Sequence, residues 1–541
     1  MAKTFLVAIE TQKVKSYLFA SPFIRETRGA SLLLDMLNRK KTEELLKKEF
    51  PGAENIYLGG GSGRIEFCSR EDAESFKNKL LDMYRQETEN ARIAVQVVEQ
   101  KPGELFTDAV SRAVELCRKS KFSSFEGKSV TGGRWIRPCS SCGRQPAIKV
   151  YHEFGKHLLC YSCLKKRNEV NKLYADTKPG EGLTPRPLAP KEKLKKRYGN
   201  DFIFTTLSEY IEGELFLPQD FDDIGACSSP ANYMGFIYAD GDRMGEHVKK
   251  LGKKFRNDAN AKEAYKLFSK ITDKATRHAA IEAVLSIVGM QHKNINGKTR
   301  PYLPAEFIMA GGDDLMLVVP AHHALDVAVR FMELFQEKTK YLANENSDLS
   351  FHEVFPQGLT ASAGVVIAHR QYPASELMTM AGELMKMAKK KAVDLAKQGI
   401  ITSALDFIVL SEASSESPKE RRDEEYTSTS ASGKTIILTE RPYTVLECKK
   451  RLQWIRDAQK SGAPKTKIKA LYPVIFKQQM VAQYEALSIK ERLKKTGNLS
   501  EDSPLNELFT ELNAFPYRDK GNGIWTTPLS EIAELYDFIK P

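Results

Sequence analysis

The sequence predicts an α+β protein with two ferredoxin-like palm domains, a four-cysteine zinc segment between them and a C-terminal helical domain. Three observations lead to this prediction. A strand–helix–hairpin–helix–strand order occurs twice, two CxxC pairs lie between the copies, and helical periodicity prevails after the second copy. We therefore expect domains at 1–125, 126–228, 229–412 and 441–541, with a flexible linker at 413–440.

The first palm domain is predicted to be a degenerate copy. Its expected elements are a strand at 3–11, a helical stretch at 29–50, a hairpin of 55–60 with 64–69, a helix at 71–89, a strand at 91–100 and a helix at 105–121. The hairpin turn runs from Gly59 to Gly63 and contains no acid. This copy therefore lacks the ligands that an active metal site would need.

The second palm domain repeats this plan with additions. Its expected elements are a strand at 234–242, helices at 243–254 and 260–290, a hairpin of 305–310 with 315–320, a helix at 321–344, a strand at 359–370, a helix at 374–396 and a strand at 403–410. A loop bounded by glycine and proline is expected before the hairpin.

The turn of the second hairpin is Gly311-Gly312-Asp313-Asp314. The glycines allow backbone angles that side chains disfavour, and the carboxylates are hard oxygen ligands. Such ligands suit Mg²⁺ or Mn²⁺ that carries a nucleoside triphosphate. The alternative is an acidic surface turn.

Asp240 ends the first strand of the same domain, in the stretch Asp240-Gly241-Asp242. Because the first strand of a ferredoxin-like sheet adjoins the hairpin, Asp240 is expected to join Asp313 and Asp314 in holding one or two divalent ions. Asp242 is a further candidate, or it caps the next helix.

Other residues are expected to bind the nucleotide. Gly241 and Gly245 leave room for phosphates near a helix N-terminus. Ser362 lies on the strand expected beside the site. Lys389, Lys390 and Lys391, near the end of the helix at 374–396, would offset triphosphate charge, or they lie on a solvated helix end.

The cysteines of the middle segment have metal-ligand spacing. Cys139 and Cys142 are followed, after the spacer 143–159, by Cys160 and Cys163. Four thiolates close a tetrahedral Zn²⁺ site with no open position, so the predicted zinc is structural. The alternatives are disulfides, a redox pair, or replacement of one cysteine by a spacer histidine, His152 or His157.

Composition restricts the class of protein. The 541 residues are 41% hydrophobic and 28% charged, which indicates a globular chain of several domains. No apolar stretch reaches the ~20 residues of a membrane span, and no signal peptide is evident, so we expect a cytoplasmic protein without a membrane partner. The net charge of +12 suits nucleic acid or nucleotide polyphosphate, and equally a Lys-rich solvated surface.

These motifs resemble a known family. The Asp-Gly-Asp strand end, the Gly-Gly-Asp-Asp hairpin, Ser-Ala-Gly-Val at 362–365 and the helix-terminal lysines look like the palm shared by diguanylate cyclases and class III nucleotidyl cyclases. The similarity is closer to the large palm-polymerase subunit of type III CRISPR effector complexes. That family pairs two palms, the second active, around a four-cysteine zinc segment and ends in a helical domain. The stretches 25–34 and 441–444 are also similar to it.

The resemblance implies a nucleotidyltransferase that converts ATP to cyclic oligoadenylate, a second messenger of antiviral defence, after target RNA binds. It implies that Asp313 and Asp314 hold the metals with Asp240. It also implies guide and target RNA and other CRISPR effector subunits as partners. Many members begin with an HD nuclease domain, but this sequence starts with a palm strand and has no His-Asp dipeptide among its nine histidines, so no HD-type nuclease is expected.

Three alternatives stay open. The chain is a catalytically silent RNA-binding scaffold subunit, or a stand-alone defence cyclase without guide RNA, or a diguanylate cyclase. The last is disfavoured because the Glu-Phe that follows the glycines in that family is absent. None of these motifs determines the base preference of the enzyme, the ring size and linkage of its product, its activating ligand or its oligomeric state.

Overall fold

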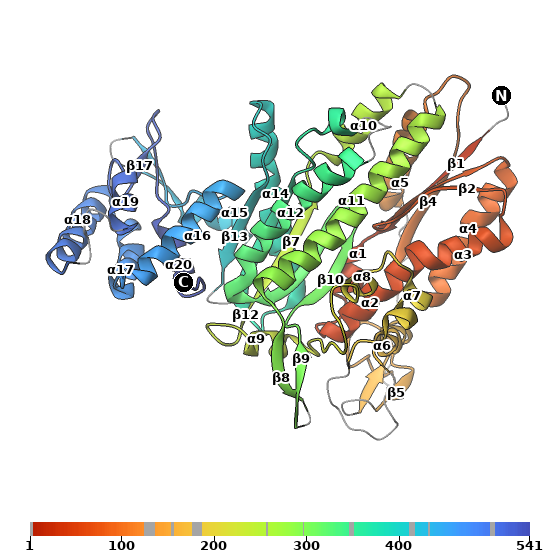
Figure 1. The fold of residues 1–541 in the computed structure, drawn as a ribbon, viewed down its shortest axis with the longest axis horizontal. Helices are drawn as coiled ribbons and strands as arrows, with labels where there is room; N and C mark the ends of the chain where they lie inside the picture. The colour runs from red at the N-terminus through yellow and green to blue at the C-terminus, as the bar shows by residue number, and fades with distance from the viewer. Residues whose placement is uncertain are drawn as a thin grey trace.

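The domains follow one another along the long axis of the molecule. The computed structural model describes residues 4–123, 136–152, 156–175, 187–255, 258–295, 297–345, 351–410, 417–430, 433–497 and 504–541. The first palm lies at one end, the second palm in the middle and the C-terminal domain at the other end, while the cysteine segment lies beside the first palm (Figure 1).

The first palm is a four-stranded sheet in the order β2-β3-β1-β4. Its elements are β1 (Phe5–Gln12), α1 (Val14–Leu18), α2 (Ile24–Met36), η1 (Leu37–Lys41), α3 (Thr42–Glu49), β2 (Glu54–Gly59), β3 (Ser62–Phe67), α4 (Arg70–Thr88), β4 (Arg92–Glu99) and α5 (Phe106–Ser123). Alternate residues of β1 point to opposite faces, so Val7 packs with α4 and Ala8 with α5. The expected ferredoxin-like order is present.

The second palm repeats that order as β10-β11-β7-β12 and extends it with β13 and β16. Its elements are β7 (Tyr233–Gly241), α10 (Met244–Lys254), α11 (Asp258–Ile287), β8 (Gln291–Ile295), β9 (Lys298–Tyr302), β10 (Glu306–Gly311), β11 (Asp314–Pro320), η2 (Ala321–His323), α12 (Ala324–Glu345), α13 (Phe351–Val354), β12 (Ala361–His369), α14 (Ala374–Lys397) and β13 (Ala404–Val409). The loop expected before the hairpin is instead a second hairpin, β8–β9.

Two hydrophobic layers sandwich the second sheet. Ile237 and Leu315 face the layer of α11 and α12, whereas Phe236 and Met316 face that of α14. The second layer continues into the first palm, where the ring of Phe19 lies 6.0 Å from that of Phe236. A shared core of this kind buries apolar surface of both palms together and fixes their relative position.

The 30-residue helix α11 runs along both palms. It contacts β2 of the first hairpin and β10 of the second. At 1.5 Å rise per residue such a helix is about 45 Å long, so one rigid element spans both hairpins. Side chains of α11 can therefore reach the turns of the two hairpins at once.

The region 413–440 is not the unstructured linker that we predicted. Where described, it forms α15 (Pro418–Glu425), β14 (Thr427–Thr429) and β15 (Thr435–Ile437); residues 411–416 and 431–432 lie outside the described residues. A capping box of Ser417 and Glu420 starts the helix, and Arg422 makes a buried bidentate ion pair with Asp406 of β13. Polar composition suggested a linker, but these charges are paired in the fold.

The basic segment 187–198 is also part of the packed fold. It contains α7 (Lys191–Tyr198), in which Leu194 and Tyr198 are buried in the main core. The other elements of the middle region are β5 (Lys149–Tyr151), β6 (His157–Leu159), α6 (Tyr161–Leu173), α8 (Ile203–Leu207) and α9 (Phe221–Ala226). Its residues 126–135, 153–155 and 176–186 lie outside the described residues.

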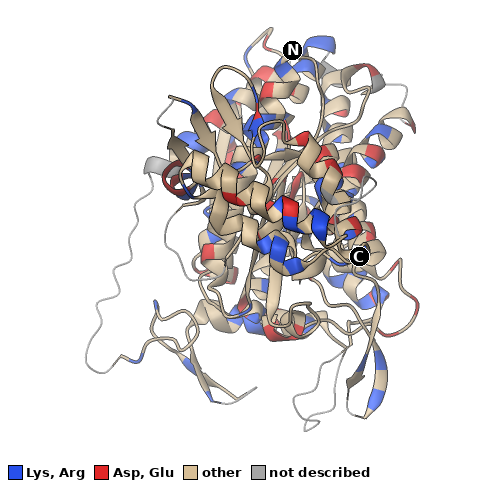
Figure 2. Cartoon of the chain, turned by 90° about the vertical axis from the view of Figure 1, so that its left-hand side faces the viewer, with Lys and Arg blue, Asp and Glu red and all other residues tan. Residues whose placement is uncertain are grey.

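The C-terminal domain is mixed rather than wholly helical. Its elements are β16 (Tyr443–Thr444), α16 (Val445–Lys460), α17 (Lys465–Ile475), α18 (Gln479–Lys495), α19 (Pro504–Glu511), β17 (Arg518–Asp519), β18 (Ile524–Thr526) and α20 (Leu529–Leu535). Strands β17 and β18 form a sheet with β14 and β15. These strands have two or three residues each, too short for period-two patterning to show in the sequence. Basic and acidic residues are interspersed over this end of the molecule (Figure 2).

None of the helices in the described ranges combines the length and the apolar character that a bilayer crossing requires.

Candidate metal and nucleotide site

The three predicted acids meet where β7 ends and β10 turns into β11. Asp240 lies directly opposite Asp314 in the antiparallel pair β7–β11, so both side chains leave the sheet on the same face. Asp313 lies in the two-residue turn, and its carbonyl accepts a hydrogen bond from the Gly241 amide (3.2 Å). The fold therefore brings together acids that are more than seventy residues apart in sequence.

The charges of these acids are poorly compensated. Burial and the neighbouring Asp240 raise the pKa of Asp313 to about 7. Burial and the charges of Asp313 and Asp240 raise the pKa of Asp314 well above its usual range. The raised pKa values show that the negative charges of the carboxylates repel one another, and a divalent cation would relieve this repulsion. The three carboxylates therefore fit Mg²⁺ or Mn²⁺. In the described ranges, no set of three acids has all its ligand oxygens within 4.8 Å of one another. The carboxylate oxygens of this cluster are therefore spaced more widely than ligands gathered around a single ion.

Two lysines supply positive charge. Lys389 of α14 donates to Asp240 Oδ2 and to the Gly241 carbonyl (2.7 Å). Burial disfavours its ammonium group, but the Asp240 charge prevails and raises the pKa of Lys389. Lys15 comes from α1 of the first palm, and its Nζ lies 4.6 Å from the centre of the Tyr238 ring. Burial and Lys386 lower the pKa of Lys15 despite the charges of the acids.

The predicted glycines differ in their constraints. A Cβ on Gly241 would lie 2.9 Å from Asp313 Cβ, so this position needs glycine for the close approach of strand and turn. Gly312 has φ +63°, which glycine adopts without strain, and Gly311 ends β10 beside it. Gly245 is exposed, and a Cβ there would meet nothing within 4 Å, so the fold does not require glycine at this position.

Asp242 and Ser362 form a buried pair behind the acids. Ser362 Oγ donates to Asp242 Oδ1 (2.7 Å), and the Asp242 amide donates to the Thr360 carbonyl. Burial raises the pKa of Asp242 to about 6, and its Oδ2 lacks a hydrogen-bond partner in the described structure. Asp242 does not cap α10, whose N-cap residue is Arg243. The pair lies next to Asp240, since Ser362 is opposite Asp240 in the sheet.

Lys390 is exposed on α14, unlike the half-buried Lys389 beside it. The adjacent Lys391 is bound to Glu447 of α16 (2.7 Å). Of the helix-terminal lysines, Lys389 is therefore the one that the helical phase directs at the acids.

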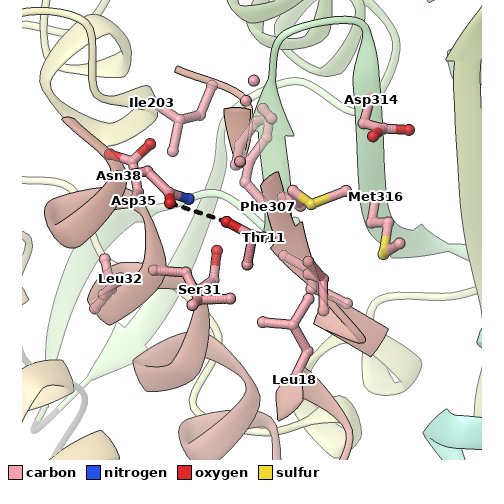
Figure 3. Close-up of a pocket in the computed structure, with 18 of the residues that line it drawn as sticks. Thr11, Leu18, Ser31, Leu32, Asp35, Asn38, Ile203, Phe307, Asp314 and Met316 are labelled. Atoms are coloured by element: carbon pink, nitrogen blue, oxygen red, sulfur yellow. Dashed lines mark hydrogen bonds between the residues drawn. The ribbon is translucent and has the colours of Figure 1, made fainter. Parts of the chain in front are cut away.

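A cavity of about 240 Å³ opens between the palms beside Asp314. In Figure 3, Asp314 lies at its rim on β11, with Met316 further along the same strand. The first palm contributes Thr11, Ser31, Asp35 and Asn38. Thr11 Oγ1 donates to Asn38 Oδ1 (2.9 Å), and these polar groups lie beside apolar ones such as Leu18 and Leu32.

Sequence reasoning missed four residues near the acids. Tyr238 precedes Asp240 by two positions, so strand alternation could have placed both on one face; its hydroxyl donates to Asp314 Oδ1 (3.4 Å). Lys15, Arg39 and Asp273 reach the site from other elements, and no local pattern marks them. Arg39 binds Asp273 through both nitrogens of its fork (3.0 and 2.7 Å).

The four predicted cysteines form one group. The ligand atoms of Cys139, Cys142, Cys160 and Cys163 all lie within 4.8 Å of one another. The sulfurs of Cys142 and Cys160 are 3.8 Å apart, as expected for a tetrahedral site with Zn–S bonds of about 2.3 Å. The residues fit a structural Zn²⁺. The group that the structure describes includes neither His152 nor His157.

A ferredoxin-like sheet with carboxylates at the end of its first strand and at its hairpin tip has the architecture of a palm domain. Residues 233–396 match the family model described as Cas10/Cmr2, second palm domain. The match includes all three acids and Lys389. It confirms the resemblance for the second palm, which is of the Cas10/Cmr2 second-palm type.

Solved structures with this fold include Csm1–Csm4 cassettes. The match to the cassette in complex with pppApApA has a TM-score of 0.53 at 13% identity and covers 99% of this chain and 69% of that chain. The match to the cassette with one ATP has a TM-score of 0.51 at 14% identity, with 100% and 70% covered. At such identities the matches show the fold. The match to the cassette with cA4, at 14% identity, has a TM-score of 0.44 and covers 72% of this chain, which there spans about half (53%) of the other chain. No curated protein matches the chain.

Proposed function

We propose that this chain is a metal-dependent nucleotidyltransferase that makes cyclic oligoadenylate from ATP, as the large subunit of a type III CRISPR RNA-guided complex. One observation carries the proposal. Asp240 and Asp314 lie opposite each other in the sheet, with Asp313 in the adjoining turn and Lys389 beside them, in a domain of the Cas10/Cmr2 second-palm family.

The matched structures support ATP as the substrate class. Csm1–Csm4 cassettes with this fold are in complex with ATP, pppApApA and cA3. By analogy, the cavity beside Asp314 would receive part of a nucleotide, since about 240 Å³ is less than the ~300 Å³ of a small ligand pocket. Csm4-like subunits, guide RNA and target RNA would be its partners.

The chemistry is transfer of an adenylyl group. The 3′-hydroxyl oxygen of one ATP forms a bond to the α-phosphorus of another, the bond from that phosphorus to the β-bridging oxygen breaks, and pyrophosphate leaves. A final attack of the terminal 3′-hydroxyl on the 5′ α-phosphate of the same chain closes the ring. Mg²⁺ or Mn²⁺, when bound, would lower the pKa of the hydroxyl and offset charge on the phosphates.

The residues of the chain have distinct roles in this reaction. Asp240, Asp313 and Asp314 would hold the ions. Lys389 holds Asp240 in place and, with Lys15, brings positive charge to the triphosphate. Gly241 lets the turn approach the end of β7. The four cysteines would hold a structural Zn²⁺ away from the reaction.

The test is incubation of the purified chain, alone and with its complex subunits and RNAs, with ATP and Mg²⁺ or Mn²⁺. The proposal predicts pyrophosphate and cyclic oligoadenylate, both lost in the double variant Asp313→Ala, Asp314→Ala. Product that persists in the double variant would remove the site assignment. Co-purified RNA without turnover would favour the silent scaffold, and RNA-independent turnover would favour a stand-alone cyclase.

A further inference from the structure

The turn that bears the acids is held from outside its own hairpin. Asp273 of α11 accepts the Gly312 amide through Oδ1 (2.8 Å), and Thr276, one helical turn on, donates to the Gly312 carbonyl (2.7 Å). Both backbone polar groups of the residue before Asp313 are therefore fixed by one helix. Asp273 is 4% exposed, so these hydrogen bonds are shielded from water.

Asp273 is in turn bound by two arginines. Arg39 of η1, in the first palm, donates to both of its carboxylate oxygens, and Arg277 donates to Oδ2 from the next turn of α11. Burial alone would raise the pKa of Asp273, but Arg39 and Arg277 hold it well below its usual range. Asp273 is therefore ionised at neutral pH and accepts the Gly312 amide as a charge-assisted hydrogen bond.

The first palm reaches the same turn by a second route. Its degenerate hairpin turn lies against the acidic one, since a Cβ on Gly60 would lie 2.9 Å from Gly312 Cα. Arg39 also makes an ion pair with Asp35 (2.9 Å), and Asp35 lines the cavity between the palms. One end of this chain of contacts therefore lies at the cavity and the other at the turn.

We infer that Asp273 is a positioning residue that sets the geometry of the metal-holding turn, and that Arg39 links this geometry to the first palm and to the cavity. Metal and nucleotide sites tolerate displacements of only about 0.5 Å, so fixing Gly312 fixes the adjoining Asp313 and Asp314. The cavity side of the link is Asp35, which lines the cavity and is ion-paired with Arg39. The role in metal binding rests on the proposed function.

The first test is hydrogen–deuterium exchange of the full chain, read on peptides that span 311–314. Asp273→Ala should speed exchange of the turn by at least about tenfold, and Arg39→Gln should speed it to a lesser extent. Asp273→Asn keeps an oxygen acceptor for the Gly312 amide and should give an intermediate result. Arg422→Gln is the matched control, because it breaks another buried bidentate Arg–Asp pair and should leave the turn unchanged.

Unchanged exchange in Asp273→Ala would overturn the inference, and unchanged exchange in Arg39→Gln would overturn the link to the first palm. The same variants are then titrated with Mn²⁺ alone by electron paramagnetic resonance. Asp273→Ala should weaken Mn²⁺ binding by about tenfold or more, and Arg422→Gln should not; equal affinities would contradict the positioning role.

The two proposals fail separately. The proposed function is contradicted if the wild-type chain binds Mn²⁺ but makes no oligonucleotide, alone or in its complex. The positioning inference is then still tested by hydrogen–deuterium exchange and by Mn²⁺ affinity. A chain that makes product while Asp273→Ala changes neither exchange, Mn²⁺ affinity nor the maximal rate contradicts the inference alone. Where Asp273→Ala fails to fold by circular dichroism, Asp273→Asn and Arg39→Gln decide.

Discussion

A single methyl group at Gly60 should disturb the acidic turn from across the palm interface. In Gly60→Ala the new Cβ would lie 2.9 Å from Gly312 Cα and 3.0 Å from Gly312 N, whereas ordinary contacts are about 3.5 Å or longer. The neighbours are backbone atoms and cannot rotate away. The two turns must therefore separate by roughly 0.5 Å, and any part of this shift taken by Gly312 displaces the adjoining acids. Since a 1 Å misplacement can cost on the order of 100-fold in rate, we expect nucleotide turnover to fall by about tenfold.

The backbone supplies a matched control for this substitution. Gly60 has φ +55°, so alanine there also costs about 1–2 kcal/mol of left-handed strain. Gly103 has φ +77° in the loop between β4 and α5, and a Cβ there would meet nothing within 4 Å. Gly103→Ala therefore carries similar strain without the clash at the turn.

The assay is the rate of pyrophosphate release from ATP by the two variants and the wild type, under the same metal and RNA conditions. Thermal unfolding scans of all three measure the cost of strain separately. The reasoning predicts similar losses of stability and a turnover defect confined to Gly60→Ala. Equal turnover in Gly60→Ala and Gly103→Ala would refute it.

Four further predictions concern charge and metal. Because the pKa of Asp313 is raised to about 7, protons compete with metal below that pH, and Mn²⁺ affinity should fall by up to about tenfold per pH unit there; a flat paramagnetic resonance titration between about pH 5.5 and 8 would contradict this. In the metal-free protein, this raised pKa stabilises the fold fully below the ordinary value of 3.8, and the stabilisation is lost as pH rises to about 7, so the unfolding temperature should drop between those two pH values. Lys389→Met should lower ATP turnover by about 10- to 100-fold and the exposed Lys390→Met by less than about twofold, measured as pyrophosphate release; equal effects would place the wrong lysine at the site. Elemental analysis should find about one zinc per chain, and Cys160→Ser should lose it and lower thermal stability; full zinc retention by that variant would contradict the four-cysteine site.

Short sequence motifs predicted those parts of the site that are formed by residues close together in the sequence. The acidic hairpin, the strand that ends at Asp240 and the CxxC pairs each depend on residues within a few positions of one another. Strand order then brought Asp240 to Asp313 and Asp314, because a ferredoxin-like sheet places the first strand beside the hairpin. The order predicted for both palms is the order observed.

Tertiary contacts supplied what the sequence did not reveal. Lys15 and Arg39 reach the site only because the palms pack face to face, and Asp273 does so because α11 spans both hairpins. Polar and charged composition predicts a linker at 413–440, whereas in the structure Arg422 is buried against Asp406. Pairing of this kind depends on residues distant in sequence, so composition alone does not predict it.

The stoichiometry of ATP turnover tests the central claim most directly. Ring closure releases one pyrophosphate for every adenylate incorporated and leaves no 5′-triphosphate on the product, so mass spectrometry and pyrophosphate release should give a ratio of one. Both signals should vanish when Asp313 and Asp314 are replaced by alanine. Conversion of ATP to ADP and phosphate, or product that survives the double substitution, would contradict the account.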